Sequence, residues 1–449
     1  MLPHTRRNIV ALVHALLCCI ATGHAGSLPG LHIVQQPGTF WSPIAFIQDP
    51  AQDNVQYVLS QGGLIYIITD SVAHPVPFLD ISEQVHFLDE MGCLGLAFAP
   101  DYASSGRFYV LFTSKDPLGA TVLARFNRSA SNPSSADPSS QFNLVFDGNP
   151  YIQRPPGIHN GGTMIFGADG YLYFGIGETG LEELSQDPTS MHGKIHRIDV
   201  NVPDEDPIGY RIPPSNPFLP ENNPPVAGSL PSLWHVGLRN PWKWCFDDRG
   251  RGHTNAMIIG DVGAALYEEI DVAPANTPAH NFGWPLFEGF NPISNLPAMF
   301  LPLTDPVHVY EHTTFNSVTG GYVLRNGRQC AYFGRYFFAD FGSGEVYSAA
   351  FDGSTLTDVV NHTSELFGSA RFYLPSFGRD AAGNLYILRY DPGTIYRIAS
   401  NEDPLLGDIN TDGAVDFQDL NIVLSDFGPT YTFTDLNAVL SNYGVSCGI

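Results

Sequence analysis

The chain has 449 residues and is strongly acidic, with 45 Asp and Glu against 21 Lys and Arg and a formal net charge of −24 at pH 7. That charge would repel nucleic acid and anionic membrane surfaces, so we expect neither as a partner. The 45 Gly, 36 Pro and 12% aromatic residues are typical of many short strands and turns, and they argue against a helical bundle.

The first 25 residues have the pattern of a secretory signal peptide. Arg6 and Arg7 form a positive start, residues 9–21 form an apolar run, and residues 23–25 (Gly-His-Ala) form a small-residue cleavage site. A membrane anchor is the alternative, but the apolar run is shorter than a spanning helix. We therefore expect cleavage after Ala25 and a secreted or periplasmic mature protein.

Four cysteines remain after that cleavage, and an exported protein can join them in disulfides. Three full pairings are possible, and the spacing does not choose between them. No two of the four lie within a few residues of each other, so a zinc knuckle is not expected. The four residues are Cys93, Cys245, Cys330 and Cys447.

Between residues 30 and 400 the chain repeats a loose unit, in which a Gly or Asp turn is followed by an alternating run rich in Tyr, Phe, Val and Ile. Repeated strands without intervening helices favour either stacked sheets or a radial propeller. The length is too great for one simple sandwich, so we predict an all-β propeller with half-buried strands. The clear copies are residues 62–68, 106–112, 171–176, 334–339 and 383–388.

Ionisable and small residues gather at three turn edges beside short apolar segments. Residues 159–162 (His-Asn-Gly-Gly) precede the strand predicted at 171–176, which is followed by Glu178. Residues 237–242 and 260–263 repeat this placement. Because loops from every blade ring the centre of a propeller, we expect these segments to form one site. The alternative is that their side chains only cap turns.

The composition changes at residues 401–406, which we interpret as a linker before a separate module at 407–449. Residues 408–419 match a calcium-binding loop, with oxygen-bearing side chains at alternate positions, Gly413 at the bend and a carboxylate at the end. An acidic turn without metal is the alternative. The expected ligands are the side chains of Asp408, Asn410, Asp412, Asp416 and Asp419 and the backbone carbonyl of Ala414.

Two segments of this module repeat one phrase, Phe-Gln-Asp-Leu-Asn-Ile-Val-Leu-Ser at 417–425 and Phe-Thr-Asp-Leu-Asn-Ala-Val-Leu-Ser at 433–441. We predict two short helices paired through like faces, with Leu420, Val423, Leu424 and Phe427 on the face of the first. The module resembles a dockerin-type EF-hand domain that retains one of two calcium loops. That resemblance implies either docking to a partner protein or a calcium-stapled helix pair.

Several ordered motifs resemble those of the soluble glucose/sorbosone dehydrogenase family, which includes quinone-dependent aldose sugar dehydrogenases and Hedgehog-interacting-protein-like members. The resemblance implies a six-bladed β-propeller at residues 30–400. It also implies, in many members, pyrroloquinoline quinone with calcium over the propeller axis. The motifs are residues 95–101, 159–162, 237–242, 260–263, 268–271, 281–285 and 317–322.

The resemblance implies a catalytic histidine and a contact to the quinone. His159 matches the general base that takes the proton of a sugar hydroxyl, and a near-neutral imidazole suits that task at physiological pH. Glu178 matches the acidic partner that orients this histidine. Arg239 and Asn240 match residues that contact the quinone, where a guanidinium pairs with carboxylates and with charge on the reduced ring.

Two calcium positions follow from the same resemblance. Gly263 and Ala264 match residues whose backbone carbonyls bind the catalytic calcium, which polarises the quinone carbonyl. Glu269 matches a ligand of a second, structural calcium. The resemblance therefore implies calcium and pyrroloquinoline quinone as cofactors.

These expectations describe a secreted quinone- and calcium-dependent oxidoreductase that oxidises a hydroxyl of a sugar or polyol and passes the electrons to an external acceptor. Glycan hydrolysis is a further possibility that rests only on the dockerin-like tail. It lacks an assignable pair of catalytic carboxylates.

One departure from the family favours a non-catalytic alternative. The sugar oxidisers hold the quinone with a lysine and an arginine pair, whereas residues 341–344 contain no lysine, and neither Arg371 nor Arg379 aligns clearly. The phrases at 317–322 and 336–341 are similar to the Hedgehog-interacting-protein-like branch, whose members can use the propeller as a binding scaffold. The alternative is an extracellular propeller that binds carbohydrate or protein.

Overall fold

Antiparallel strands make up most of the regular structure in the computed structural model, which describes residues 28–153, 157–313 and 315–447. The mainly β architecture predicted from the alternating runs is confirmed. The expected signal peptide at residues 1–25 lies outside the described residues, so its cleavage stays a prediction. Within the described residues, no helix combines the length and apolar character needed to cross a bilayer.

The described strands form five sheets of four or more strands and one two-stranded ribbon. The nine-stranded sheet has the order β1 (Leu31–Gln35), β27 (Ile395–Ser400), β26 (Leu385–Leu388), β25 (Phe377–Arg379), β2 (Pro43–Gln48), β3 (Val55–Ser60), β4 (Leu64–Thr69) and β5 (Val72–Ala73), with β6 (Leu79–Asp80) also on β4. The ribbon consists of β18 (Phe287–Glu288) and β19 (Asn291–Pro292).

The other four sheets are four-stranded and antiparallel, and in each the chain runs from one edge to the other. The first two consist of β7 (Cys93–Phe98), β8 (Arg107–Lys115), β9 (Leu118–Arg128) and β10 (Ala136–Asn143), and of β11 (Met164–Phe166), β12 (Leu172–Ile176), β13 (Lys194–Ile198) and β14 (Leu233–Val236). The last two consist of β15 (Pro241–Phe246), β16 (Met257–Asp261), β17 (Tyr267–Ala273) and β20 (His308–Glu311), and of β21 (Val318–Val323), β22 (Arg335–Asp340), β23 (Val346–Phe351) and β24 (Leu356–Asn361).

The innermost strands β2, β7, β11, β15, β21 and β25 all line one axial cavity of about 420 Å³. A shared cavity means that the sheets are arranged radially, which favours the predicted propeller over two stacked sheets. Each sheet is then covered on both faces by its neighbours. In β8, for example, Phe108, Tyr109 and Val110 are all buried, although they point alternately to opposite faces. The prediction of half-buried strands is wrong for this strand.

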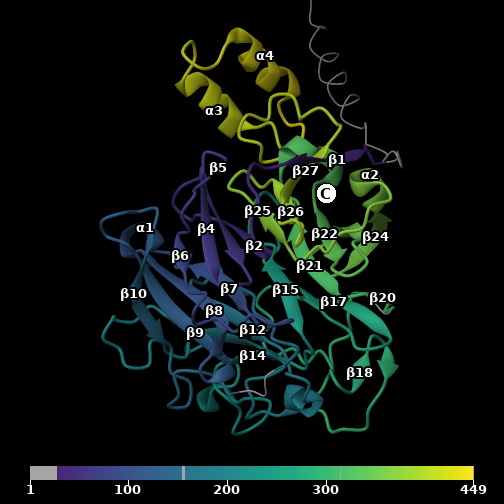
Figure 1. Cartoon of the computed structure of the whole chain (residues 1–449). Coiled ribbons are helices and arrows are strands. Elements are labelled where there is room, and N and C mark those ends of the chain that lie inside the picture. Colours follow the sequence, from purple (N-terminus) through teal and green to yellow (C-terminus); the bar gives the residue numbers. More distant parts are fainter. Residues whose placement is uncertain (1–27, 154–156, 314, 448–449) are drawn as a thin grey trace, which may run out of the picture.

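The first described strand pairs with the last strand of the β region. β1 is antiparallel to β27, with Leu31 opposite Ser400. A parallel pair between β2 and β25, with Phe46 opposite Gly378, joins the two halves of the nine-stranded sheet. Figure 1 shows purple β1 beside β27, at the end of the molecule that also carries the C-terminal helices. Residues from both ends of the β region therefore complete one sheet.

Two of the helices form a pair beyond the β region. These are α3 (Phe417–Ser425) and α4 (Phe433–Asn442), whereas α1 (Tyr102–Ser105) and α2 (Thr363–Phe367) are short turns between strands. Val423 and Val439 occupy the same position in the repeated phrase, and both are fully buried with Val415. Leu424 is 53% exposed, so its predicted place on the paired face is wrong. It lies about 100° around the helix from Val423 and faces solvent.

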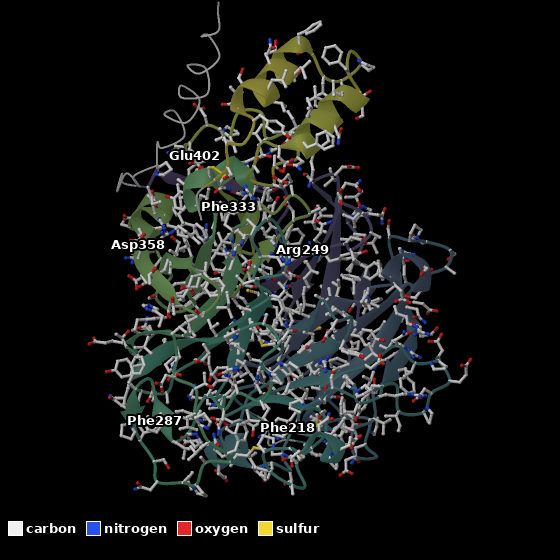
Figure 2. All side chains as sticks on the ribbon, turned by 180° about the vertical axis from the view of Figure 1, so that it is seen from behind. Phe218, Arg249, Phe287, Phe333, Asp358 and Glu402 are labelled. Atoms are coloured by element: carbon white, nitrogen blue, oxygen red, sulfur yellow. A yellow bond between two sulfur atoms is a disulfide. The ribbon has the colours of Figure 1, made fainter. Side chains whose placement is uncertain are left out.

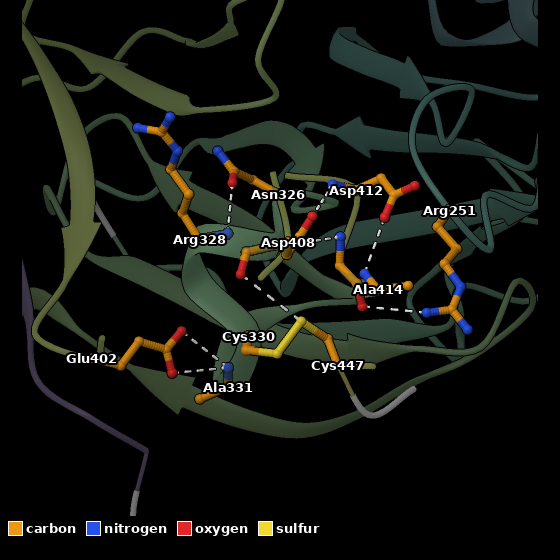
Figure 3. Close-up of a disulfide and its surroundings, with 12 residues drawn as sticks. Arg251, Asn326, Arg328, Cys330, Ala331, Glu402, Asp408, Asp412, Ala414 and Cys447 are labelled. Atoms are coloured by element: carbon orange, nitrogen blue, oxygen red, sulfur yellow. Dashed lines mark hydrogen bonds between the residues drawn. A yellow bond between two sulfur atoms is a disulfide. The ribbon is translucent and has the colours of Figure 1, made fainter. Parts of the chain in front are cut away.

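The C-terminal segment is fastened to the β region by a disulfide and by hydrogen bonds (Figure 3). Cys330 is bonded to Cys447, and the backbone N–H of Gly327 donates to Thr411 O at 3.0 Å. None of the three full pairings considered from the sequence forms, because Cys93 and Cys245 are free and buried. Each lies in the core of a separate sheet, beyond reach of a partner cysteine.

Loss of this disulfide is expected to loosen the C-terminal segment. The bond joins residues 117 apart in sequence, and a cross-link of that span contributes about 4–5 kcal/mol by loop-closure entropy. Cys447→Ser should therefore make residues 401–406 more susceptible to protease, which limited proteolysis with mass spectrometry measures. Wild type treated with dithiothreitol is the matched control. Equal cleavage of oxidised wild type and the variant would contradict the expectation.

Candidate functional site

His159 begins the tight loop that leads into β11. Its φ of 57° is left-handed, and its backbone N–H donates to Glu90 Oε2 at 2.6 Å. Gly161 also has a left-handed φ, of 62°, and a Cβ there would lie 2.7 Å from Gly175 O. Glycine is required at this position because both the backbone angle and the close approach exclude a side chain. The loop therefore holds His159 at one fixed place.

The side chain of His159 is paired with Glu178, as the resemblance implied. Its Nδ1 lies 2.7 Å from Glu178 Oε1, and the two side chains are 8% and 1% exposed. The other carboxylate oxygen of Glu178 accepts the N–H of Gly180. Because Glu178 is an acceptor, it favours the tautomer with hydrogen on Nδ1 and leaves Nε2 for another partner.

Arg239 and Asn240 lie next to this pair, immediately before β15. The N–H of Glu178 donates to Arg239 O at 2.9 Å, and Asn240 Oδ1 accepts the N–H of Gly161 at 2.9 Å. Residues 79 positions apart are thereby brought into one hydrogen-bonded set. The prediction that these segments converge agrees with this geometry.

Asp261, at the end of β16, organises the two residues before β15. Its Oδ2 accepts the N–H of Arg239 at 2.8 Å and its Oδ1 accepts that of Asn240 at 2.6 Å. Burial raises the pKa of this carboxyl to about 7, although both hydrogen bonds act to lower it. Sequence reasoning quoted the Gly-Asp-Val-Gly motif but did not assign this residue. The signal that could have identified Asp261 is its place in this motif, residues 260–263, beside a short apolar segment.

The guanidinium of Arg239 is partly exposed at the same face. Nη1 donates to Val262 O at 3.0 Å, and the group lies 5.5 Å from the ring centroid of Trp284. No other acceptor for its side chain is found within the described residues. The remaining N–H groups are therefore free to bind an anionic ligand.

Gly263 and Ala264 are held by carboxylates through their backbone N–H groups. Gly263 donates to Glu268 Oε2 at 3.1 Å, and Ala264 donates to Glu288 Oε1 at 2.8 Å. Glu288 Oε1 also accepts the three following N–H groups, which explains why its pKa is lowered despite burial. The loop thus wraps around Glu288, a residue that sequence reasoning did not assign as a ligand side chain.

Glu269 belongs to a group of buried acids on neighbouring strands. It pairs across the sheet with Asp261, and strand alternation places Asp271 on the same face. Burial raises the pKa of Glu269 to about 8 and that of Asp271 well above its ordinary value, with the neighbouring carboxyls adding to both shifts. Both carboxyl oxygens of Asp271 lack a hydrogen-bond partner among the described residues. A cation would supply the missing partner.

The C-terminal loop turns its oxygen-bearing side chains inward. Asp408 Oδ2 accepts the N–H of Gly413 at 2.9 Å, Asp412 Oδ1 accepts that of Ala414 at 3.0 Å, and Asp419 closes the loop by accepting the N–H of Ile409 at 2.8 Å. Figure 3 shows Asp408 and Asp412 near the disulfide. The remaining predicted ligands are Asn410, which donates to Asp412 Oδ2, and Asp416, which caps α3.

These acids do not form a ready-made metal site. Across residues 28–153, 157–313 and 315–447, no three His, Cys, Asp or Glu side chains converge in a way that could hold a metal ion. In the C-terminal loop the carboxylates are occupied by backbone N–H groups. Binding of a cation there would require these side chains to exchange some N–H contacts for the ion.

Arg371 and Arg379, the two arginines considered as quinone contacts, do not lie beside His159. Arg371 is exposed and donates only to Ala370 O within the described residues. Arg379 is the last residue of β25 and lines the axial cavity, where it donates to Asp248 Oδ1 at 2.5 Å. The inner strands β2 and β25 are parallel, so Arg379 lies towards the opposite end from the loops that precede these strands.

Comparison with known proteins places the chain in a family. Residues 42–397 match the family described as Glucose / Sorbosone dehydrogenase, and the chain belongs to that family. The fold is similar to the PQQ-bound form of aldose sugar dehydrogenase from Streptomyces coelicolor, with a TM-score of 0.63 and 22% identity, covering 83% of this chain and 99% of that one. This likeness supports the β-propeller fold.

Curated relatives of different kinds are also similar. The HIPL1 protein of Arabidopsis thaliana is 29% identical over 443 residues, which cover 80% of this chain and 61% of that protein. The Hedgehog-interacting protein of Mus musculus is 24% identical over 410 residues, covering 81% of this chain and 52% of that protein. The chain thus spans little more than half the length of these relatives.

Replacing Asp261 tests how far the loops depend on it. Asp261→Asn leaves one oxygen for two N–H groups and adds a donor beside them, and a buried unsatisfied group costs about 1–3 kcal/mol. We expect urea denaturation to show a loss of that size. Asp352→Asn is the matched control, because Asp352 accepts two backbone N–H groups on an exposed turn. The same loss in both variants would argue against a special role for Asp261.

Proposed function

We propose that the chain is a secreted oxidoreductase, dependent on calcium and pyrroloquinoline quinone, that oxidises a hydroxyl group of a sugar or polyol. Electrons would pass to an external acceptor. The observation that carries the proposal is the hydrogen-bonded set of His159, Glu178, Arg239 and Asn240. Family membership and the likeness to an aldose sugar dehydrogenase support it.

We also propose that the propeller has six blades. Four sheets would supply one blade each, and the nine-stranded sheet would supply two, divided at the parallel pair between β2 and β25. In this arrangement β1 completes the blade formed by β25, β26 and β27. The antiparallel pair between β1 and β27 would then close the ring of blades.

In the proposed mechanism His159 Nε2 takes the proton of the substrate hydroxyl. Glu178 holds the opposite ring nitrogen, so the imidazole keeps one orientation and its positive charge is stabilised when the proton arrives. The quinone, when bound, would supply the electrophilic centre that accepts the hydride, which no side chain provides. The chain's own part is to orient the hydroxyl and hold its proton.

Arg239 is the proposed cationic contact of the quinone. Its unpaired N–H groups and its place beside the ring of Trp284 fit a planar ligand that carries carboxylates. Asn240 would hold the histidine loop through Gly161 and offer its amide N–H groups to the ligand. These donors belong to one rigid loop because Asp261 fixes both backbone N–H groups.

Calcium is proposed near the same loops. The unpartnered carboxylate of Asp271, beside Glu269, has the oxygen chemistry that calcium prefers, and a cation would offset the charge of the buried acids. The backbone carbonyls of Gly263 and Ala264 are proposed for the catalytic ion. Their N–H groups are already bound to Glu268 and Glu288, so the loop is held in place before any ion binds.

Removal of the His159 imidazole should strongly reduce turnover without preventing cofactor binding. After reconstitution with calcium and pyrroloquinoline quinone, we expect His159→Ala to reduce kcat for dye reduction by about 10²–10⁴-fold, since that is the usual contribution of a general base. The assay uses a panel of aldoses. His253→Ala is the matched control, because His253 is exposed and hydrogen-bonded only locally. Quinone-independent activity, or full activity of His159→Ala, would remove the proposal.

A non-catalytic extracellular propeller is the second candidate. The absence of lysine at residues 341–344 favours it, as does the position of Arg379 in the axial cavity rather than beside His159. Similarity to the mouse Hedgehog-interacting protein supports the same reading. Calorimetry with pyrroloquinoline quinone separates the candidates. No quinone binding, together with a positive glycan-array or protein pull-down result, would favour the binding scaffold.

We propose that residues 408–419 bind one calcium ion and act as a dockerin-like EF-hand loop. The inward-facing side chains of Asp408, Asp412 and Asp419 support this proposal. The ion would tie α3 to the loop that contacts Gly327 on the β region. Docking of this module to a partner protein stays a prediction.

The repeated phrase provides a matched pair of variants for the calcium loop. Asp419 and Asp435 occupy the same position in the two copies, but only Asp419 closes a predicted calcium loop. Calcium should raise the Tm of the wild type and of Asp435→Asn, and it should raise that of Asp419→Asn much less, because a required carboxylate is lost. Differential scanning calorimetry with calcium or EGTA measures this. A similar calcium response of both variants would contradict the assignment.

A further inference from the structure

The axial cavity is separate from the site around His159. Its lining comes from the inner strands and from residues on either side of them, and it reaches Thr163, directly after the loop at residues 159–162. It includes none of His159, Glu178, Arg239 and Asn240. At about 420 Å³ it has the size of a pocket for a small molecule, and it is too small for a macromolecule. No part of the proposed oxidation uses it.

The charge of this cavity is opposite to that of the whole chain. Its lining contains Lys243, Arg249 and Arg379 but only one carboxylate, Asp248, in a protein whose formal charge is −24. Figure 2 shows Arg249 near the middle of the molecule, between the C-terminal helices and Phe218. Cations gathered in a concave, partly apolar space focus the field on a negative ligand.

Lys243 is buried without a partner of opposite charge. It is 8% exposed, and its Nζ has neither a hydrogen-bond acceptor nor a carboxylate within salt-bridge distance in the described part of the chain. Its one contact of this kind is the ring of Trp242, at 4.2 Å. Burial alone lowers its pKa to about 7. A buried ammonium group in this state is destabilising unless a ligand supplies an anion.

Lys194 shows how a buried lysine is satisfied by the protein itself. It is fully buried as well, but its Nζ donates to Leu184 O at 2.5 Å and to His192 O at 2.8 Å. Lys243 has no equivalent carbonyls. The difference between the two lysines therefore lies in hydrogen bonding and not in burial.

A second unsatisfied donor lines the same cavity. Arg379 donates through Nη2 to Asp248 and lies 5.3 Å from the ring centroid of Tyr322, but its Nη1 has no partner within the described residues. Arg379 is 9% exposed. Two buried cationic side chains on different inner strands thus line one space.

We propose that the axial cavity binds a small oxyanion, a carboxylate or a phosphate, with Lys243 as its principal cationic partner and Arg379 Nη1 as a further donor. The ligand would replace the missing counter-charge of Lys243, and the apolar remainder of the lining would exclude water around it. The proposal stands independently of the oxidoreductase function.

Binding should be linked to the protonation of Lys243. The other charged lining groups are Arg249, Arg379 and Asp248, and Asp248 is paired with Arg379. Guanidinium groups keep their proton in proteins. Burial raises the pKa of Tyr322 to about 12 and lowers that of Lys243 to about 7, so Lys243 is the lining group that titrates near neutral pH. An anion stabilises the ammonium form. Affinity should therefore be highest below the free pKa and fall by up to about tenfold per pH unit above it.

The experiment uses the full chain, whose three lysines are Lys115, Lys194 and Lys243. Protein labelled with ¹³C-lysine is titrated with sulfate, which stands for phosphate-like anions and keeps its charge near neutrality, and separately with gluconate as the carboxylate. Calorimetry gives the dissociation constant at about pH 6 and about pH 8. Tighter binding of one probe identifies which oxyanion class the cavity prefers.

We expect a saturable shift of the Lys243 signal only, with affinity about tenfold weaker at the higher pH. Lys243→Met should lose binding, and Lys115→Met, an exposed control, should retain it. Absence of saturable binding by both anions, or unchanged binding in folded Lys243→Met, would overturn the proposal. If Lys243→Met does not fold, the wild-type spectra decide, because an unmoved Lys243 signal at high anion concentration also overturns it.

Discussion

The arrangement of the loops around His159 depends on the two hydrogen bonds that Asp261 accepts. Its carboxylate holds the N–H groups of Arg239 and Asn240, and these residues in turn hold Gly161 and Glu178 through a side-chain oxygen and a backbone carbonyl. His159 is then positioned by Glu178. Burial makes the ionised carboxyl costly, as its raised pKa shows, and the two backbone donors offset part of that cost. One buried carboxyl group thus helps to fix the relative positions of loops from two separate sheets.

The repeated turns and alternating runs were sufficient to predict a mainly β chain and the meeting of His159 with Arg239, because inner-strand loops of a radial fold share one end. They were not sufficient for Asp261, Asp271 or Glu288. The partners of these acids depend on the register between β16 and β17 and on the path of the following loop, and residue spacing does not reveal either. The disulfide between Cys330 and Cys447 was also unpredictable, since the two residues meet only through the packing of the C-terminal segment on the β region.

The two ends of the propeller have different chemical environments. The loop before β11 carries the imidazole of His159, and the end of β16 carries Asp261 at the same end of the molecule. The hairpins after β15 and β21 carry Arg251 and Gly327, which contact the C-terminal loop. The cationic axial cavity lies between them, and its Arg249 is two residues from Arg251. The C-terminal module therefore occupies the end away from His159. It therefore leaves the end that carries His159 uncovered.

The pairing of β1 with β27 also determines when the protein can finish folding. The partner of Leu31 is Ser400, so the last sheet lacks an edge until nearly the whole β region has been synthesised. Until then β1 exposes the unpaired N–H and C=O groups of a free strand edge to the surroundings. A chain made from its N-terminus would therefore keep β1 without its partner strand until residues 395–400 have been added.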